Sequence, residues 1–253
     1  MLYFLLPAIL GLFTWKAAAK DVWGEVFLLL TVVCATAHVY QFVRWHGFLR
    51  AAQVAAVSGS LFVIVLVGVL YEWGLPHRGL ALNGENLEGV YLAREDLRLA
   101  ALVGANLRGA DLIQTDLTDA KLMRANLTGT NFSSANLTGA SLMNANLTDA
   151  ALIQTDLTNA FLLVADLSNA KLWGANLTGA SLAFTNLGGV EFIGADLKGT
   201  DLSHANLTGA YLADAQHLEQ EQLDDACISK GGTPPTLPEG LKPPQNECVK
   251  WVR

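Results

Sequence analysis

Residues 105–129 read ANLRG-ADLIQ-TDLTD-AKLMR-ANLTG, which are five pentapeptides with leucine at the centre of each. The same spacing extends in both directions without an insertion, from Leu82 to Leu212. The 27 central positions are all Leu except Phe132 and Phe192, and the residue two places before each centre is small, mostly Ala. A fixed short period is the mark of a repeat architecture, so this stretch indicates a solenoid built from pentapeptides.

A period of five matches neither the α-helix nor the β-strand. It fits a chain that turns a corner every five residues, so that four pentapeptides close one square coil and the coils stack at about 4.8 Å. The heptamer LIQTDLT occurs at residues 112–118 and again at 152–158, an offset of two 20-residue coils. We number the four sides from the unit at residues 80–84, so that side one recurs at 100–104 and side two is 85–89 and its equivalents every 20 residues. One column on side two predicts a structural, hydrogen-bonded ladder, and it contains Asn86, Asn106, Asn126, Asn146, Asp166, Asn186 and Asn206.

The A(N/D)LxX word over residues 80–214 resembles the bacterial pentapeptide-repeat family, and so does the following HLEQEQLDDACISKGGTPPTLPEGLKPP. The resemblance implies an all-β solenoid, a right-handed quadrilateral β-helix. It also implies a role that is mostly non-enzymatic, although a few soluble members mimic DNA and protect topoisomerases. Apolar residues at helical offsets predict a short capping helix within His217–Ile228 of the C-terminal region 215–253, followed by a Pro-rich tail, because a solenoid needs its ends covered.

Residues 1–73 contain three apolar runs, at 1–15, 25–43 and 55–71. A span needs about 20 apolar residues, with about 17 tolerated, so the sequence predicts an α-helical transmembrane bundle of about three spans. The first run is short, which leaves open two spans plus an interfacial first segment. Residues 74–79 form a short linker to the solenoid. We therefore expect an integral protein of the bacterial inner membrane that contacts lipid through its N-terminal helices.

The side of the membrane on which the solenoid lies stays open. The loops Lys16–Lys20 and Arg44–Arg50 carry two basic residues each, so the positive-inside rule is close to a tie. Cys227 and Cys248 can form a disulfide only in an oxidising compartment, which favours the periplasm. The arginines within residues 78–98 favour the cytoplasm instead.

The outward positions of the repeats separate the four sides. Sides two and four are polar, whereas sides one and three carry apolar stripes, and contiguous apolar patches usually mark interaction surfaces. Side one is the stronger candidate because its apolar residues cluster in neighbouring coils. These stripes predict binding of a partner protein, or self-association, through Val103, Met123, Met143, Phe161, Leu163, Val164 and Phe184 on side one and Ile113, Ile153, Trp173 and Ile193 on side three.

No constellation of residues predicts catalysis, a metal site or a cofactor, because adjacent outward residues on a convex rod form no pocket. The net charge of −7 and the lack of a basic face argue against nucleic-acid binding. The sequence therefore predicts a membrane-anchored, non-enzymatic scaffold. One alternative is a DNA-mimicking topoisomerase protector, although Arg98 and Lys198 dilute the aspartates of side four. Another is the assembly domain of a small channel or transport-linked protein.

Overall fold

The computed structural model describes residues 79–248. The predicted spans at 1–15, 25–43 and 55–71 lie outside these residues, so the membrane bundle and its boundaries stay predictions. Between residues 79 and 248, no helix is both long enough and apolar enough to cross a membrane.

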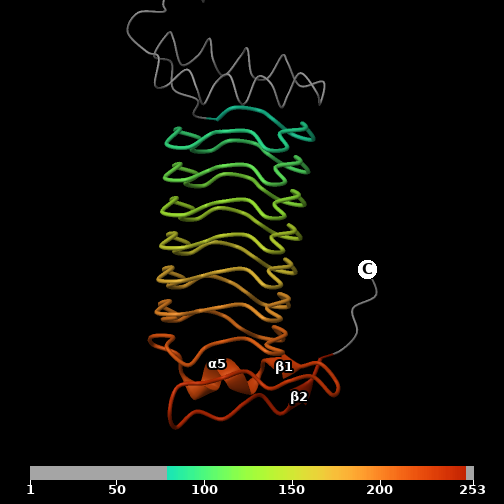
Figure 1. Cartoon of the computed structure of the whole chain (residues 1–253), viewed down its shortest axis with the longest axis vertical. Coiled ribbons are helices and arrows are strands. Elements are labelled where there is room, and N and C mark those ends of the chain that lie inside the picture. The colour runs from blue at the N-terminus through green and yellow to red at the C-terminus, as the bar shows by residue number, and fades with distance from the viewer. Residues whose placement is uncertain (1–78, 249–253) are drawn as a thin grey trace, which may run out of the picture. The chain divides into compact units, whose positions relative to one another are not determined.

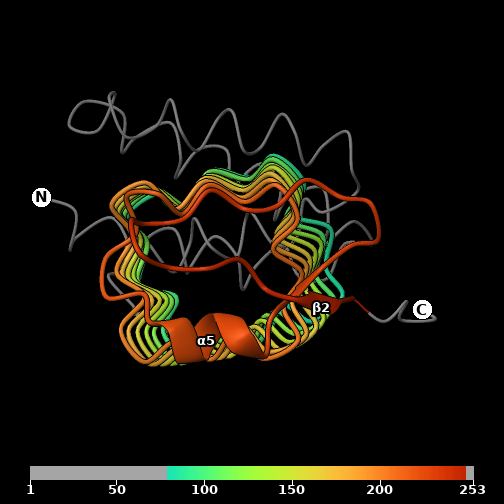
Figure 2. The same cartoon turned by 90° about the horizontal axis from the view of Figure 1, so that it is seen from below.

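The repeats form a stack of coils, and the residue before each central Leu or Phe pairs with the residue 20 positions later (Figure 1). Parallel bridges join Ala81 to Ala101 at one end and continue to Asp196 and Gln216 at the other. Seen along the stack, successive coils superimpose on a four-sided outline (Figure 2). The coil of four pentapeptides expected from the sequence is therefore the repeating unit of the structure.

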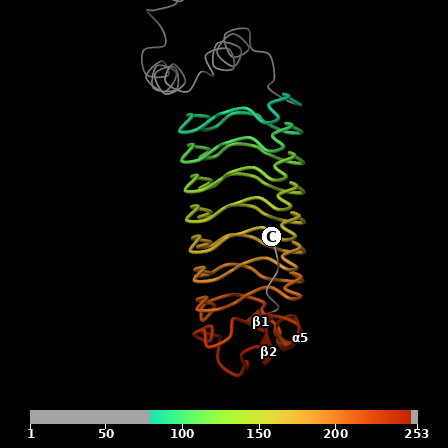
Figure 3. The ribbon, with the colours of Figure 1, turned by 90° about the vertical axis from the view of Figure 1, so that its right-hand side faces the viewer.

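Backbone hydrogen bonds between coils hold the stack together. The N–H of Leu102 donates to the carbonyl of Lys121 at 2.8 Å, and the N–H of Lys121 donates back to the carbonyl of Ala100 at 2.8 Å. The N–H of Gly104 donates to Met123 at 2.8 Å. This pattern recurs along the stack, so the turns of successive coils lie above one another (Figure 3).

A β-turn follows every central residue. In a representative unit the N–H of Ala105 donates to the carbonyl of Leu102 at 3.1 Å, and Gly104, the second turn residue, has φ of +67°. Within residues 79–209 every second turn residue has positive φ, which a type II turn requires. This requirement explains why Gly, Asn, Asp and Gln fill most of these positions.

The central Leu and Phe side chains and the small residues before them form one continuous buried core. Where Thr replaces Ala at the small position, its hydroxyl is buried and donates to a backbone carbonyl of the preceding coil. Thr155 Oγ1, for example, lies 2.8 Å from the carbonyl oxygen of Phe132. The hydroxyls of the other four make equivalent bonds: Thr115, Thr130, Thr185 and Thr200.

The amide ladder on side two is present in two runs. Asn106 Nδ2 donates to Asn86 Oδ1 at 2.8 Å, and Asn126 Nδ2 donates to Asn106 Oδ1 at 3.0 Å. Further along, Asn186 donates to Asp166 at 3.1 Å and Asn206 donates to Asn186 at 3.0 Å. The column is therefore structural, as its regularity predicts.

The helix of the C-terminal cap is shorter than the sequence predicts, and more of the cap continues the backbone pairing of the solenoid. Helix α5 covers only Gln220–Asp224, where the prediction placed a helix within His217–Ile228. Strand β1 (Cys227–Ile228) pairs in parallel with strand β2 (Asn246–Glu247), and Cys227 also bridges to Asn206. At Cys227 the backbone again follows the path of the coils, because its bridge to Asn206 continues the column of backbone bridges on side two.

Helix α5 seals the last regular coil. The side chain of Gln222 donates to the carbonyl oxygens of Leu197 at 2.9 Å and Thr200 at 2.8 Å. Leu223 packs into the end of the core. The predicted Pro-rich tail wraps the end of the stack, since Thr236 bridges to Tyr211. A disulfide joins Cys227 to Cys248 and holds β2 against β1.

Candidate interaction surface

Most of the predicted contact residues lie at corners of the coil and not on its flat sides, which corrects the expectation of two striped faces. Val103, Met123, Met143 and Leu163 each occupy the first turn position after side one, and all four are half-buried. The corresponding residues after side three lie at the diagonally opposite corner, where Ile113 and Ile153 are half-buried and Trp173 and Ile193 are exposed. The turn after each centre causes the shift, because it takes the chain around the corner.

One repeat departs from all the others. Unit Ala160–Val164 reads AFLLV, and it is the only repeat between residues 80 and 214 whose three outward positions are all apolar and not Gly. Phe161 is 52% exposed on side one, where its bridge partners in the two adjacent coils are Ser141 and Ser181. Because serine is small, the phenyl ring projects above its neighbours.

The same cluster continues down the adjoining corner. Val164 and Phe184 occupy the second turn position of successive coils, with φ of +60° and +58°. His204 occupies this position in the next coil and stacks on Phe184, with ring centroids 4.7 Å apart and an interplanar angle of 23°. We call Phe161, Leu163, Val164, Phe184 and His204 together the Phe161 patch.

The backbone of the Phe161 patch is strained at its β-branched member. A left-handed backbone crowds the Cβ atom, and it costs an L-residue other than Gly about 1–2 kcal/mol. Asn and Asp tolerate it best, and β-branched residues are outliers there. Val164 keeps this conformation while it is 45% exposed. Neither local conformation nor burial explains why valine occupies the position.

The diagonally opposite corner has a different character. Trp173 Nε1 donates to Glu191 Oε2 at 2.6 Å, and Lys171 Nζ lies 5.6 Å from the Trp173 ring centroid. Ile193 is 40% exposed beside them. The polar and charged groups here engage the tryptophan, so this corner is less apolar than the Phe161 patch.

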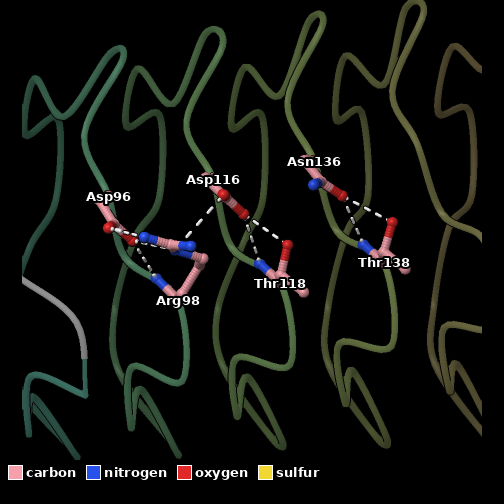
Figure 4. Close-up of polar contacts among 6 residues, drawn as sticks. All are labelled: Asp96, Arg98, Asp116, Thr118, Asn136 and Thr138. Carbon is pink, nitrogen blue, oxygen red and sulfur yellow. Dashed lines mark hydrogen bonds and ion pairs between the residues drawn. The ribbon is translucent and has the colours of Figure 1, made fainter.

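The aspartates of side four form the other candidate surface, shown in Figure 4. Arg98 Nε donates to Asp96 Oδ1 at 2.8 Å and lies 3.6 Å from Asp116 Oδ2. The backbone N–H and hydroxyl of Thr118 both donate to Asp116 Oδ1. Asn136 repeats the Asp116 arrangement in the next coil, with Thr138 as donor. The Asp and Asn side chains of this column therefore stabilise the turns that follow them by accepting hydrogen bonds. Arg98 neutralises part of the negative charge of Asp96 and Asp116.

Two pKa shifts accompany these contacts. The hydrogen bond to Asp96 and its charge raise the pKa of Arg98. At Asp196, desolvation acts to raise the carboxyl pKa, but the hydrogen bond to His217 and the contacts with Lys198 outweigh it and lower the pKa. His217 Nδ1 lies 2.8 Å from Asp196 Oδ1, which links the cap to side four.

Three exposed apolar residues are absent from the predicted set: Tyr91, Leu99 and Tyr211. The two tyrosines precede a centre on side three, and Tyr211 Oη donates to Asp214, which raises the pKa of the phenol. Leu99 takes a second turn position on side four, with φ of +60°. Sorting all three outward columns by hydropathy on all four sides would find them.

The sequence of the coils matches a known repeat. The family model described as pentapeptide repeats matches with 8 copies, at residues 82–119, 120–159, 145–182, 164–199 and 175–214. No protein of curated function matches the chain.

Several solved structures are similar to the chain. HetL, a pentapeptide repeat protein involved in heterocyst differentiation regulation from the cyanobacterium Nostoc, is 31% identical over 69% of this chain and 96% of its own, with a TM-score of 0.23. A pentapeptide repeat protein from the cyanobacterium Cyanothece is 34% identical over 53% of this chain and 97% of its own, with a TM-score of 0.24. QnrB1, a plasmid-mediated fluoroquinolone resistance protein, is 18% identical over 60% of this chain and 92% of its own, with a TM-score of 0.30.

Proposed function

The chain belongs to the pentapeptide-repeat family, whose fold is a right-handed β-helix, and from that premise we propose that it is a membrane-anchored, non-enzymatic scaffold that binds a protein through the Phe161 patch. The observation that carries the proposal is the unit Ala160–Val164, in which all three outward side chains are apolar. Replacing polar outward residues by Phe, Leu and Val does nothing for the core, which the central Leu162 already fills.

The physical cost of the patch supports a role in binding. Phe161 is left half-exposed to water, and Val164 holds a strained backbone. Burying Phe, Val or Leu side chains against a partner stabilises a complex by about 1.5–3 kcal/mol for each side chain fully buried. A few side chains that become fully buried near the centre of an interface supply most of its binding energy. Phe161, at the centre of the patch, is the side chain that a partner would bury.

Membrane attachment is the second part of the proposal, and it rests on the three apolar runs at 1–15, 25–43 and 55–71. The Cys227–Cys248 disulfide supports a solenoid on the oxidising, periplasmic side of the inner membrane, because cytosolic thiols are kept reduced. Alkylation of free thiols in intact cells, followed by mass spectrometry, tests this placement. Recovery of Cys227 and Cys248 as alkylated thiols would argue for the cytoplasmic side.

The experiment for the binding role compares Phe161→Asp and Phe184→Asp with Ile193→Asp, a control at the opposite corner. All three are purified with the full chain in detergent, and the proteins that co-purify are compared. We expect Phe161→Asp and Phe184→Asp to lose the bound protein and Ile193→Asp to keep it. Unchanged co-purification for both Phe variants would overturn the proposal.

The alternative of a DNA-mimicking topoisomerase protector depends on the acidic column of side four. In the structure Arg98 neutralises part of that column, and Asn136 interrupts it (Figure 4). A DNA mimic requires a dense and continuous negative stripe. These contacts favour the scaffold role. The channel-assembly alternative rests on residues before 79, outside the part of the chain that the structure describes.

A further inference from the structure

Side one carries a symmetric pattern of residues centred on Phe161. One column of parallel bridges runs through five coils in the order Lys121, Ser141, Phe161, Ser181 and Asp201. Lys121 and Asp201 are exposed, and each lies two coils, about 10 Å, from Phe161. The column therefore has an apolar centre, small neutral neighbours, and opposite charges at its two ends.

We propose that side one binds a second copy of this chain in an antiparallel, two-fold symmetric pair centred on Phe161. The proposal rests on the proposed function and names its partner. In a two-fold interface the same patch faces itself, so Phe161 meets Phe161 of the other copy and Ser141 meets Ser181. Lys121 of each copy then lies opposite Asp201 of the other, which gives two attractive charge pairs.

The residues at the two corners that flank side one also pair favourably under the same two-fold rotation. At the corner before side one, antiparallel pairing brings the coil that carries Asp119 opposite the coil that carries Lys198, and both residues are exposed. The coils between them carry Gly139 and Gly179 at this corner, and the side chains of Asp119 and Asn159 lie over these two glycines. This juxtaposition adds two further charge pairs of opposite sign.

At the corner after side one, Val164 meets its own counterpart on the axis and Asn144 lies opposite Phe184. Arg124 lies opposite His204, and an arginine stacks well on an aromatic ring. A residue on the two-fold axis faces the same residue of the other chain. An apolar side chain at position 164 would therefore pack against an identical apolar side chain, which suits the strained Val164. This placement accounts for a valine that the turn itself disfavours.

Charge also excludes the other two-fold arrangement. In a parallel pair, with the axis along the stack, Lys121 would face Lys121 and Asp201 would face Asp201. Like charges placed opposite each other disfavour the wrong partner arrangement. In the antiparallel pair the first described coils, which begin at Gly79, lie at opposite ends.

Charge reversal tests the pair directly, using the full chain in detergent and the self-association constant from sedimentation equilibrium. Lys121→Asp alone and Asp201→Lys alone each create two repulsive pairs, so each should dimerise about tenfold more weakly than the native chain. Mixing the two variants should restore dimerisation, because each then presents the charges that the other needs. A native chain that stays monomeric, or a mixture no better than either variant alone, would overturn the inference.

Cross-linking tests the register, and it remains informative if a charge variant folds poorly. In a Cys34→Ser background, a short bis-maleimide should join Ser141→Cys to Ser181→Cys chains when the two are mixed. Efficient cross-linking of Ser141→Cys with itself would contradict the antiparallel register.

Failure of this inference can be told from failure of the proposed function. If the native chain is monomeric while Phe161→Asp still abolishes co-purification of a different protein, the second copy is excluded and the scaffold role stands. If Phe161→Asp affects neither self-association nor co-purification, both fail.

Discussion

Val164 lies directly above Phe184 at one corner of the solenoid, and both residues hold the left-handed backbone that the second turn position requires. Asn144 occupies the same position one coil earlier, with φ of +58°. The corner therefore changes within two coils from a residue that suits the turn to residues that do not. Binding accounts for this change better than folding does.

Replacing Val164 with asparagine should separate stability from binding. Because Asn tolerates the left-handed backbone, we expect Val164→Asn to stabilise the fold by about 1 kcal/mol in denaturant unfolding. The same variant should self-associate more weakly, because it removes an apolar side chain from the Phe161 patch. The mirror control, Asn144→Val, should destabilise the fold by a similar amount. A loss of stability in Val164→Asn would contradict this account of the corner.

The buried threonines give a second prediction. Thr155 Oγ1 donates to the carbonyl of Phe132, which also accepts the N–H of Ala135 at 2.9 Å. Thr155→Val keeps the shape and removes the donor, so it should cost about 1 kcal/mol of folding free energy. Thr155→Ser keeps the donor and serves as the control for the lost methyl group. If the native and Thr155→Val proteins have equal free energies of unfolding, the hydroxyl makes no net contribution to stability.

Removing the disulfide should loosen the cap and leave the solenoid intact. The bond closes a 21-residue separation, and a cross-link of this length stabilises by about 3 kcal/mol. Each coil contacts only its neighbours, so the effect should stay near the end of the stack. In Cys248→Ala, hydrogen exchange should speed up over Cys227–Glu247 and stay unchanged around Phe132. Faster exchange throughout the stack would contradict this local role.

The contact between Asp196 and the cap predicts a pH dependence. The folded-state pKa of Asp196 lies below its ordinary value, so ionisation of this carboxyl stabilises the fold above the ordinary pKa of Asp. The contribution is lost as the pH falls through the lowered pKa. Native protein should therefore exceed Asp196→Asn in stability at neutral pH, and the difference should vanish in acid. The effect should be small, since the carboxyl is 32% exposed.

Much of the solenoid could be predicted from the sequence, because a five-residue period leaves few ways to bury a leucine in every repeat. The repeated LIQTDLT word even specifies the coil length. The turns were harder, because the sequence does not say which outward position turns the corner. The contact residues were therefore assigned to flat sides, although most of them lie at corners.

The C-terminal cap shows the other limit. Apolar residues at helical offsets predicted a helix within His217–Ile228, but only Gln220–Asp224 are helical. Backbone pairing with Asn206 and Asn246 takes Cys227 into the ladder, and these contacts are distant in sequence. The pattern of side chains within a segment does not reveal such pairing, so tertiary contacts override local propensity here.

Photo-cross-linking in the cell tests whether the Phe161 patch is a binding surface. A photoreactive phenylalanine analogue replaces Phe161 in one strain and Tyr91 in another, since both side chains are about half-exposed. We predict a cross-linked product from position 161, with a mass that identifies a second copy or another protein, and little or none from position 91. No product from position 161, or equal yields from the two positions, would contradict the account.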